Sequence, residues 1–537
     1  MTPAGSDDSR LLRNTAVMSV GTALSRLTGL LRVLTVAYVL GIGRLSDAYN
    51  VANTTPNIVY DLVLGGVLSA VFVPVFVEWI ETRGREEAWR SARAIMTFAV
   101  LLLTGAAVLI MLLAEVVIHA YTLQGTGPDL AQYRQLATFF LVIFMPQIVF
   151  YGWGAIATGL LNAHRRFAVP MFAPILNNLT VIATMMLFVA FTHGSTPSVA
   201  TTTPAERWVL GIGTTLGVFA MTVVLWPPLR ATGFRWRFVL DVHDEALRRI
   251  VRLAGWVFFY VLVNQIAYVV VILLANRVAG GYTAYSYAYT FFQLPYAIFA
   301  VSIFTALLPS LSSRWTDHDG RGYLVLLSQG MRSTALIVLP ATAGLIAIAL
   351  PISRLFFQHF HVTSADASLL AGTLALFATG LFTFALFQLL IRGFYAMQDT
   401  RTPALINLVA TAIGTAVNFI YFRYLGVKGL ALGQTTAYTI ATIAALLVMR
   451  RRLGSLDGRR VASSVGRIAI ASAVTGVVAL ATAEWLGSAF AATTTGSELV
   501  QVIVATAAGV AAFLAMAWCL RIQEVATVTE IVRRRTR

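Results

Sequence analysis

The sequence contains a single cysteine, a single lysine and few charged residues of any kind. Because Cys519 stands alone, no disulfide within the chain is possible, and thiol chemistry can support neither the fold nor catalysis. We expect Cys519 to be a small core residue in the last apolar run. Only 12% of the 537 residues are charged whereas 58% are hydrophobic, and the mean hydropathy of +0.78 excludes a soluble globular protein. The sequence therefore predicts an integral membrane protein.

Apolar runs recur along nearly the whole chain, each close to the roughly 20 residues that cross a bilayer as a helix. Short segments rich in Arg, Asp, Gly and Pro separate these runs, and none is long enough to form a soluble domain. We predict an all-α polytopic membrane protein with fourteen transmembrane helices, centred near Leu27, Leu64, Leu103, Phe144, Ile182, Phe219, Val263, Ile298, Pro340, Ala378, Ile413, Ala441, Val474 and Ala508.

The formal net charge of +16 is distributed unevenly between the loops. If the N-terminus is cytoplasmic, the loops and tails on that side hold 30 Lys and Arg residues and the other side holds 7, which with Arg26 and Arg32 accounts for all 39. Because basic loops of membrane proteins face the cytoplasm, we expect both termini to be cytoplasmic and the number of spans to be even. Topology accounts for the basic charge, and we predict no nucleic-acid partner.

Two halves of the chain resemble each other. The segment "DAYNVANTTPNIVY" at Asp47 resembles "AYSYAYTFFQLPYA" at Ala284, and two further pairs of segments match in the same order, at offsets of roughly 220 to 240 residues. Because this period contains six spans, we expect two six-helix lobes related by a pseudo-two-fold axis along the membrane normal. The predicted divisions are 1–231 for the N-terminal lobe (spans 1–6), 232–455 for the C-terminal lobe (spans 7–12), and 456–537 for a C-terminal helix pair (spans 13–14) with a cytoplasmic tail.

Two arginines interrupt the first span, in "ALSRLTGLLRVLTVAYVLG". An arginine at the centre of a membrane helix costs about 2.5 to 3.5 kcal/mol on insertion scales, and such residues usually face a cavity or a partner. Arg26 and Arg32 are six residues apart, so they lie on broadly related faces of the helix, and Gly29 between them permits a bend. We predict that both arginines bind an anionic substrate.

Polar residues recur along the second span at spacings of three or four, which places them on one helical face. This polar stripe consists of Asp47, Asn50, Thr54, Asn57 and Asp61. Pro56 removes a backbone hydrogen bond within the stripe, and we predict a hinge there. We expect Asp47, Asn50, Asn57 and Asp61 to face water and contact substrate. Two other interpretations stay open: a structural ion pair between one arginine and Asp47 or Asp61, and a polar interface between helices.

The second half supplies polar but neutral residues at the corresponding place. The predicted second-lobe cavity residues are Asn264, Gln265, Tyr289, Thr290 and Gln293, with a second hinge at Pro295. We therefore predict an asymmetric cavity, cationic on the N-terminal lobe and rich in hydroxyl groups on the other. Arginines beside hydroxyls and amides suit an anionic head group that carries sugars, since guanidinium forks grip phosphate. Ordinary packing between helices is the alternative.

Motifs of ATP-driven pumps, serine hydrolases, zinc peptidases and diphosphate-binding transferases are absent from the sequence. His359 and His361 are two residues apart, which does not place them side by side on a helix, and no cluster of other ligands accompanies them. We predict no catalytic residues, no metal site, no cofactor and no enzymatic activity.

The segments "SRLTGLLR" (25–32), "SDAYNVANTTPN" (46–57) and "FVPVF" (72–76) resemble motifs of the MurJ (MviN) lipid II flippase family, in the multidrug/oligosaccharidyl-lipid/polysaccharide exporter superfamily. "LLNAHRRFAVPMFAPILNN", "LPYAIFAVSIFTALLPSLS", "FFQHFHVTSADA" and "RGFYAMQDTRTP" resemble later signatures in the same order, so the resemblance spans nearly the whole chain. It implies a bacterial cytoplasmic-membrane protein with an alternating-access cavity. The implied substrate is lipid II, the undecaprenyl-pyrophosphate-linked peptidoglycan precursor, carried from the inner to the outer leaflet.

The resemblance also implies roles for particular residues. Arg26, Arg32 and Asp47 stand at positions that the family uses for substrate handling, and the last two helices would form a groove for the polyprenyl tail. The chain departs from the family elsewhere.

Many members have basic residues where this chain has Tyr60 and Asp61, an acidic residue at Gly65 and an arginine at Thr290. Half of the usual cationic set is thus missing.

These observations predict a lipid II flippase whose partners are the lipid-linked anionic glycan and membrane lipids, with cell-wall synthesis proteins as candidate partners. The alternatives are an exporter of another polyprenyl-linked glycan and a cation-coupled drug antiporter of the same superfamily, although an antiporter should favour acidic cavity residues. A non-transporting membrane scaffold of cell-wall synthesis is disfavoured by the short tails. An intramembrane glycan transferase lacks its acidic metal motif.

Overall fold

The computed structural model describes residues 5–65, 76, 78–79, 82, 84–164, 166–195, 198–241, 245–358, 362–454, 456–489 and 494–525. Every regular element within these ranges is a helix. The chain divides into two compact units, Met1–Gly280 and Gly281–Arg537, which are described in turn. The predicted lobe boundary at 231/232 derives from the sequence repeat and stays a prediction.

The first unit consists of ten helices and one π-helical turn within its described residues. They are α1 (Gly5–Leu40), α2 (Arg44–Tyr60), the π-helical turn η1 (Asp61–Gly65), α4 (Arg85–Leu112), α5 (Ala114–Tyr121), α6 (Leu130–Phe144), α7 (Gln147–Ala163), α8 (Ala168–Thr192), α9 (Pro204–Val223), α10 (Trp226–Arg230) and α11 (Glu245–Ala275).

The second unit has the same composition. Its described elements are α12 (Gly281–Pro295), the π-helical turn η3 (Tyr296–Ala300), α13 (Val301–Thr316), α14 (Gly320–Ala347), α15 (Ala349–Phe357), α16 (Ser364–Thr379), α17 (Leu381–Ala396), α18 (Arg401–Leu425), α19 (Val427–Leu453), α20 (Gly458–Ala489) and α21 (Thr495–Cys519).

The helices confirm the predicted fold class of an all-α polytopic membrane protein. Within the described residues, eleven helices are long and apolar enough to cross a membrane, and the number is thirteen if the bent pairs α12–α13 and α16–α17 are each one span. Each of these thirteen coincides with one predicted span. The remaining predicted span, centred near Leu64, begins in α2 and η1 and continues into residues outside the described ranges. His359 and His361, for which we predict no metal site, also lie outside the described residues.

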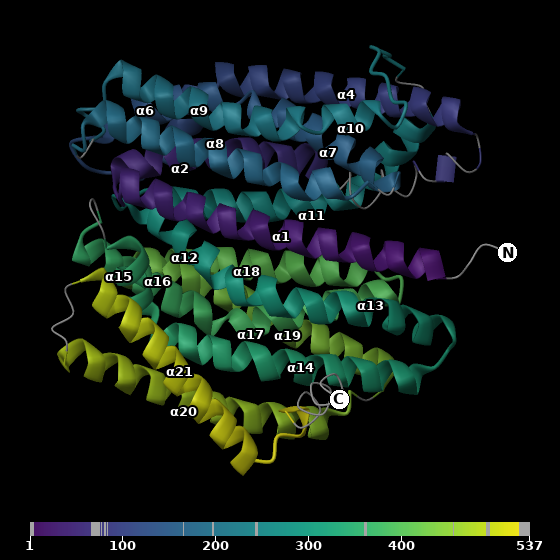
Figure 1. Ribbon diagram of the computed structural model, residues 1–537, viewed down its shortest axis with the longest axis vertical. Helices are drawn as coiled ribbons and strands as arrows, with labels where there is room; N and C mark the ends of the chain where they lie inside the picture. Colours follow the sequence, from purple (N-terminus) through teal and green to yellow (C-terminus); the bar gives the residue numbers. More distant parts are fainter. Residues whose placement is uncertain are drawn as a thin grey trace. The chain divides into compact units, whose positions relative to one another are not determined.

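Small residues allow neighbouring helices of the first unit to approach closely. Helix α8 lies beside both α1 and α9 (Figure 1). A Cβ atom added at Gly217 of α9 would lie 2.5 Å from Oδ1 of Asn177 in α8, and one added at Gly21 of α1 would lie 2.9 Å from Cβ of Met171. Membrane helices associate by such close packing, because lipid supplies no hydrophobic driving force between them.

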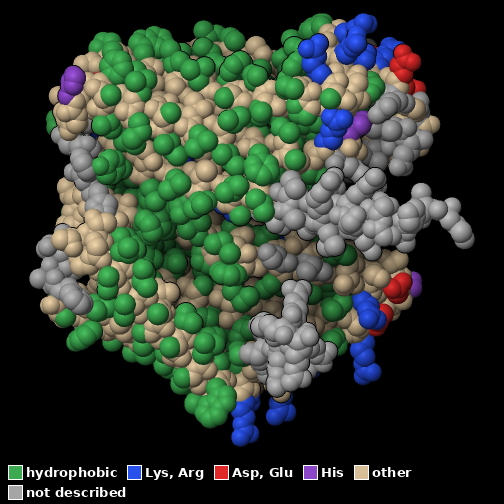
Figure 2. Space-filling model, in the orientation of Figure 1, with side chains coloured by type: hydrophobic (Ala, Val, Ile, Leu, Met, Phe, Trp, Pro, Cys, Tyr) green, Lys and Arg blue, Asp and Glu red, His purple; other side chains and the backbone are tan. Residues whose placement is uncertain are grey.

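Arginine side chains gather at one end of the first unit. Figure 2 shows them at the end where α4 begins and α10 ends, whereas hydrophobic side chains cover much of the rest of the visible face of this unit. Beneath this end, Trp89 stacks on His164 with ring centroids 5.0 Å apart and packs against Phe234. The arrangement agrees with the uneven charge predicted from the loops.

In the second unit, α20 and α21 lie side by side, and α20 also packs on α14 (Figure 1). Gly509 of α21 faces Ala479 and Thr475 of α20, so these two backbones approach closely. Cys519 ends α21 and is exposed. The expectation that it is a core residue is therefore wrong, because α20 and α14 cover other faces of the last helices.

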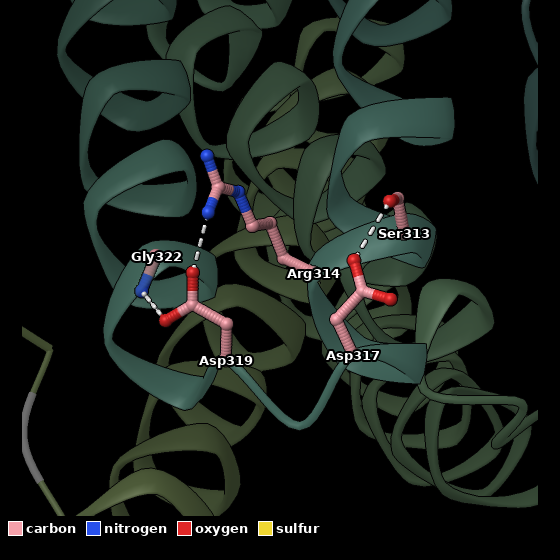
Figure 3. Close-up of polar contacts among 5 residues, drawn as sticks. All are labelled: Ser313, Arg314, Asp317, Asp319 and Gly322. Carbon is pink, nitrogen blue, oxygen red and sulfur yellow. Dashed lines mark hydrogen bonds and ion pairs between the residues drawn. The ribbon is translucent and has the colours of Figure 1, made fainter.

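The turn between α13 and α14 is held by charged side chains (Figure 3). Asp319 caps α14, accepting a hydrogen bond from the Gly322 amide at 2.8 Å and one from Nη1 of Arg314 at 2.6 Å. The Ser313 hydroxyl donates to Asp317 at 3.1 Å. The Gly322 amide and, after it, Arg314 hold the pKa of Asp319 below its ordinary value. These contacts hold the turn between α13 and α14 in one conformation.

Both predicted hinge prolines precede π-helical turns. Pro56 lies in α2 shortly before η1, and Pro295 ends α12 immediately before η3. Tyr296, the first residue of η3, lies 235 residues after Asp61, the first residue of η1, which falls within the offsets of the sequence repeat. The segment Gly281–Ala300, which includes η3, and the next segment Ile303–Thr316 are bent by 40° relative to each other. Proline and π-helical turns are both established causes of such bends.

Candidate functional site

Helix α1 carries Arg26 and Arg32 through a segment, Val20–Leu40, with a mean hydropathy of 1.4. Arg26 is exposed and Arg32 is half-buried. Between them, the Asn178 side chain of α8 donates to the carbonyl of Ser25 at 3.2 Å and to the hydroxyl of Thr28 at 3.0 Å. These bonds fix α1 against α8 at the turn that separates the two arginines.

Gly29, the predicted hinge in this helix, also faces Asn178. A Cβ atom added at Gly29 would lie 3.5 Å from Nδ2 of Asn178, an ordinary contact distance. The helix continues without interruption through Gly29. No ion pair joins Arg26 or Arg32 to any other residue that the structure describes.

The guanidinium of Arg32 lies close enough to the hydroxyls of Tyr49 and Tyr151 to interact with them electrostatically. Tyr49 of α2 is buried and its hydroxyl forms a hydrogen bond of 2.8 Å with Thr214 of α9. Tyr151 of α7 forms a side-chain hydrogen bond with Asn57. Arg32 therefore interacts electrostatically with two neutral phenol groups.

The polar stripe continues from Asn57 to Asp61. The Asn57 amide also donates to the backbone carbonyl of Asn53 at 3.0 Å, and the rings of Tyr60 and Tyr151 lie 5.7 Å apart. Asp61, at the start of η1, is exposed and accepts a hydrogen bond from Gln265 of α11 at 3.4 Å.

The structure thus brings together two predicted site residues, Asp61 and Gln265, that lie 204 positions apart. Asn50 is half-buried on the same helix as Asn57. Asn264, the neighbour of Gln265, is half-buried and donates to the Tyr260 carbonyl of its own helix at 2.8 Å.

Asp47 has a different environment from the rest of the stripe. It is fully buried, and its carboxylate accepts a hydrogen bond of 2.7 Å from the backbone amide of Gly280. Gly280 has φ +73°, and a Cβ atom there would lie 2.7 Å from Cγ2 of Ile42. Asp47 therefore ties the start of α2 to the segment that follows α11.

Arg44 completes this connection. Its guanidinium donates to the carbonyl of Asn276 at 2.8 Å and to that of Thr126 at 2.9 Å, and lies 5.5 Å from the centroid of the Tyr133 ring. The Tyr133 hydroxyl donates to the side chain of Asn276 at 3.2 Å. We call Arg44, Asp47, Tyr133, Asn276 and Gly280 the buried latch. It joins α2, α6 and the end of α11 within the first unit.

The predicted residues of the second unit form a separate network. Tyr289 is hydrogen-bonded to Gln293 and to Tyr438 of α19, and its ring packs on Phe377 of α16 at 5.5 Å. The Thr290 hydroxyl donates to the carbonyl of Ser286 at 3.0 Å. Asn264 and Gln265 belong to the first unit, whereas Tyr289, Thr290 and Gln293 belong to the second.

Two elements of the site were not among the predicted residues. Tyr151 lies in an apolar run, where only its hydroxyl distinguishes it from the flanking aromatics. Arg44 was counted among the basic residues of a loop. Its role depends on carbonyls at residues 126 and 276, for which the sequence carries no local signal.

This arrangement offers groups that suit recognition of an anion. Two guanidiniums, tyrosine hydroxyls and side-chain amides offer many hydrogen-bond donors along α1 and α2. No group of three or more His, Cys, Asp or Glu residues suited to a metal ion occurs in the described part of the chain. The chemistry available is recognition of charge and hydroxyl groups.

Comparison with known proteins agrees with this chemistry. A family model described as lipid II flippase MurJ matches residues 36–500. The chain is 29% identical over 447 residues to the lipid II flippase MurJ of Burkholderia cenocepacia, covering 82% of this chain and 84% of that protein. It is 26% identical over 480 residues to the probable lipid II flippase MurJ of Rhizobium meliloti, covering 89% and 87% of the two proteins.

Solved structures show the same fold. A lipid II flippase MurJ in an inward closed conformation matches with a TM-score of 0.73 and 22% identity, over 94% of this chain and 98% of that one. An inward-facing multidrug resistance transporter of the MATE family, in the MOP superfamily, matches with a TM-score of 0.66 and 14% identity, over 81% and 99%. Since the family model covers most of its length, the chain belongs to the lipid II flippase MurJ family.

Proposed function

We propose that this chain translocates lipid II from the inner to the outer leaflet of the cytoplasmic membrane, with Arg26 and Arg32 binding the pyrophosphate. The observation that carries the proposal is the pair of arginines in an apolar helix, neither of which has an ion-pair partner among the described residues. A charge left unpaired in a membrane helix is costly, and a phosphate-bearing substrate would offset that cost. Transport, rather than catalysis, is the activity that the family's name describes.

The remaining site residues have proposed roles that follow from their surroundings. Asn50, Asn57 and Asp61 would contact the head group from α2, while Gln265 holds Asp61 and Asn264 extends the same surface. Tyr289, Thr290 and Gln293 would supply neutral hydroxyl and amide contacts. Asp47 acts through the buried latch, because its carboxylate is enclosed and bonded to Gly280.

Alternating access would arise from bending at the two π-helical turns that follow Pro56 and Pro295. The chain is a multi-pass inner-membrane protein, as its many apolar helices and its family indicate. The distribution of arginines supports cytoplasmic termini. Moving one charge through the full membrane field is worth about 2.3 kcal/mol per 100 mV, so the membrane potential would contribute to the cycle.

A second candidate is an exporter of another polyprenyl-linked glycan. The observation that favours it is the exposed carboxylate of Asp61, hydrogen-bonded to Gln265 where many family members carry a basic residue. A substrate with a less charged head group would suit this position. The pyrophosphate would still bind at the arginines, so both candidates assign Arg26 and Arg32 the same role.

The test is the flux of lipid II to the outer leaflet in cells depleted of their own flippase and complemented with this chain. Arg26→Ala and Arg32→Ala are compared with the native protein at matched expression, and Leu27→Ala, an exposed change on the same helix, is the control. Loss of charge-assisted hydrogen bonds worth about 1.5 to 3 kcal/mol should lower flux roughly 10-fold to 100-fold in each arginine variant.

Rescue by the native chain and by Leu27→Ala, with failure of both arginine variants, supports the proposal. If the native chain does not restore flux, another lipid-linked glycan becomes the better candidate. If both arginine variants rescue fully, the arginines are structural and the proposed role is wrong.

A further inference from the structure

A cavity of about 350 Å³ lies within the second unit, and none of the candidate site residues lines it. Its walls come from α14, from the first turns of α20 and from the segment that follows α21. The lining residues are Arg332, Arg460, Ser463, Ser464, Arg467, Arg521, Ile522, Gln523 and Glu524. We call this the arginine pocket. Its volume falls in the range of about 300 to 1,000 Å³ that is usual for small-molecule sites.

Four arginines and one glutamate line the pocket, which gives it a net charge of +3. The four lining residues of α20 stand at positions 460, 463, 464 and 467, the spacing that places side chains on one face of a helix. This face therefore presents two guanidiniums and two hydroxyls to the same cavity. All four groups are hydrogen-bond donors, and an anion site requires several donors that line the same cavity.

The single carboxylate in the pocket is already engaged. Glu524 accepts a bond of 2.5 Å from Nη1 of Arg332 and one of 2.9 Å from the hydroxyl of Ser464. Side chains of this pair are only 12% and 11% exposed, and Nε of Arg332 has no partner among the described residues although it is buried. Arg467 donates to the Leu520 carbonyl at 3.5 Å. No ion pair joins Arg460, Arg467 or Arg521 to another described residue.

Arg521 stands in an unfavourable backbone conformation. It has φ +50°, in the left-handed region that glycine normally occupies after a helix. The Ile522 amide donates to the Ala517 carbonyl at 3.0 Å and the Arg521 amide to that of Trp518 at 3.1 Å, the pattern in which glycine is preferred. An arginine at this place strains the backbone, and its side chain lines the pocket.

We propose that the arginine pocket binds a phosphate-bearing anion. Guanidinium groups of like charge repel one another, and an anion between them removes that repulsion. Arginine forks and the Ser463 hydroxyl match the several acceptor oxygens of a phosphate group. The pocket is large enough for a diphosphate or for a phosphate with an attached head group. The ligand is either a soluble phosphate compound or the head group of an anionic lipid, because α20 and α21 are also membrane spans.

The proposal is independent of the proposed function, since no pocket residue belongs to the site along α1 and α2. The experiment uses the purified full-length protein in two arms. In the first, inorganic pyrophosphate is titrated into protein in a neutral detergent and binding heat is measured. In the second, protein in phosphatidylcholine nanodiscs with and without phosphatidylglycerol is compared for thermal stability.

Three variants test the pocket in whichever arm shows binding. Arg460→Gln removes a lining charge and should weaken binding about tenfold, the loss expected for charge-assisted hydrogen bonds. Arg521→Gly should weaken binding comparably while leaving the thermal stability of the ligand-free protein equal or higher, because glycine suits φ +50°. Arg459→Gln is the matched control: it removes the same charge one residue away, from a side chain that does not line the cavity.

Binding in the pyrophosphate arm alone identifies a soluble ligand, and stabilisation by phosphatidylglycerol alone identifies a lipid head group. Either result supports the proposal when Arg460→Gln and Arg521→Gly weaken the effect and Arg459→Gln leaves it unchanged. Failure of both arms overturns it. It is also overturned if Arg459→Gln weakens binding as much as Arg460→Gln does, since the effect is then one of surface charge alone.

Discussion

The segments α2–η1 and α12–η3 have similar backbones and different side chains. Each is a helix with a proline near its end, followed by a π-helical turn, and the two turns lie 235 residues apart. Along α2, charged and amide side chains form contacts in addition to aromatic ones, and the buried latch fixes the start of the helix. The sequence of α12 carries no charged residue, and its contacts are aromatic or neutral: Tyr285 lies 5.0 Å from Phe377, and Tyr289 stacks on Phe292 at 5.8 Å.

This difference separates two requirements that a transporter has to meet. Bending depends on backbone geometry, which a repeated sequence can supply twice. Recognition of an anion depends on side-chain charge, and the arginines proposed to supply it lie on α1, a helix that contacts α2. The comparison therefore predicts that changes to the backbone should act alike in the two segments, whereas changes to side-chain charge should not.

The largest expected effect is at Gly280, the backbone donor of the buried latch. In Gly280→Ala the methyl group meets Ile42 in a positive-φ conformation, and strain of about 1–2 kcal/mol plus overpacking of about 1–3 kcal/mol should lower the free energy of unfolding. Gly194→Ala is the control, because Gly194 has φ +74° but open space around it. Thermal unfolding in detergent measures both variants, and equal losses would show that the latch is not tightly packed.

The next effect contrasts the charged contact of α2 with a neutral contact of α12. Asp47→Asn weakens a buried charge-assisted hydrogen bond and should cost about 1.5 to 3 kcal/mol, whereas Tyr289→Phe removes neutral hydrogen bonds worth about 0.5 to 1.5 kcal/mol. Denaturation monitored by tryptophan fluorescence compares the two. A greater loss in Tyr289→Phe would mean that the two segments do not differ as described.

The two prolines test the shared geometry. Pro56→Ala and Pro295→Ala each restore a backbone donor and favour a straighter helix, so each should slow lipid II flux several-fold while leaving thermal stability equal or higher. Flux in complemented cells and unfolding temperature are measured together. A loss of flux in only one variant would show that bending is not shared between the segments.

The smallest effect concerns the charged turns of the second unit. Partial burial raises the pKa of Asp399, but hydrogen bonds from Thr402 and Arg452 lower this pKa by a larger amount. The pKa of Asp399 therefore lies below its ordinary value. A carboxyl group with a depressed pKa stabilises the fold above its unfolded pKa of about 3.9, and this contribution is lost as the pH falls through the folded-state value.

Between pH 5 and pH 8, Asp399→Asn should therefore have a slightly lower unfolding temperature than the native protein. Below about pH 4, the unfolding temperatures of the two proteins should become more similar. Asp129→Asn, an exposed charge at the start of α6, is the control for loss of charge alone. A difference from the native protein that persists unchanged at pH 3 would contradict the assignment.

The spans could be predicted from the sequence because long apolar runs impose helices on the chain in a bilayer. Arg26 and Arg32 could also be identified as candidate site residues, because they are charged residues within an apolar run. Pro56 and Pro295 indicated bends, but the π-helical turns beside them carry no sequence signature of their own.

The buried latch could not be predicted, because Arg44 and Asp47 act on backbone groups that are distant in sequence. Asp47 was assigned to the substrate surface from its spacing to Asn50 and Asn57. Spacing gives the face of a helix, but it does not reveal which neighbouring segment covers its first turn. The interaction of Tyr151 with Arg32 was missed for a similar reason, since it joins separate helices.

The exposed position of Cys519 has a practical consequence. It is the sole thiol of the chain and ends α21, two residues before the strained Arg521. A maleimide fluorophore would therefore label the native protein at one defined place without any preparatory substitution. The emission of this fluorophore would report on changes near the end of α21 when ligands are added, so the native protein needs no introduced cysteine for such a measurement.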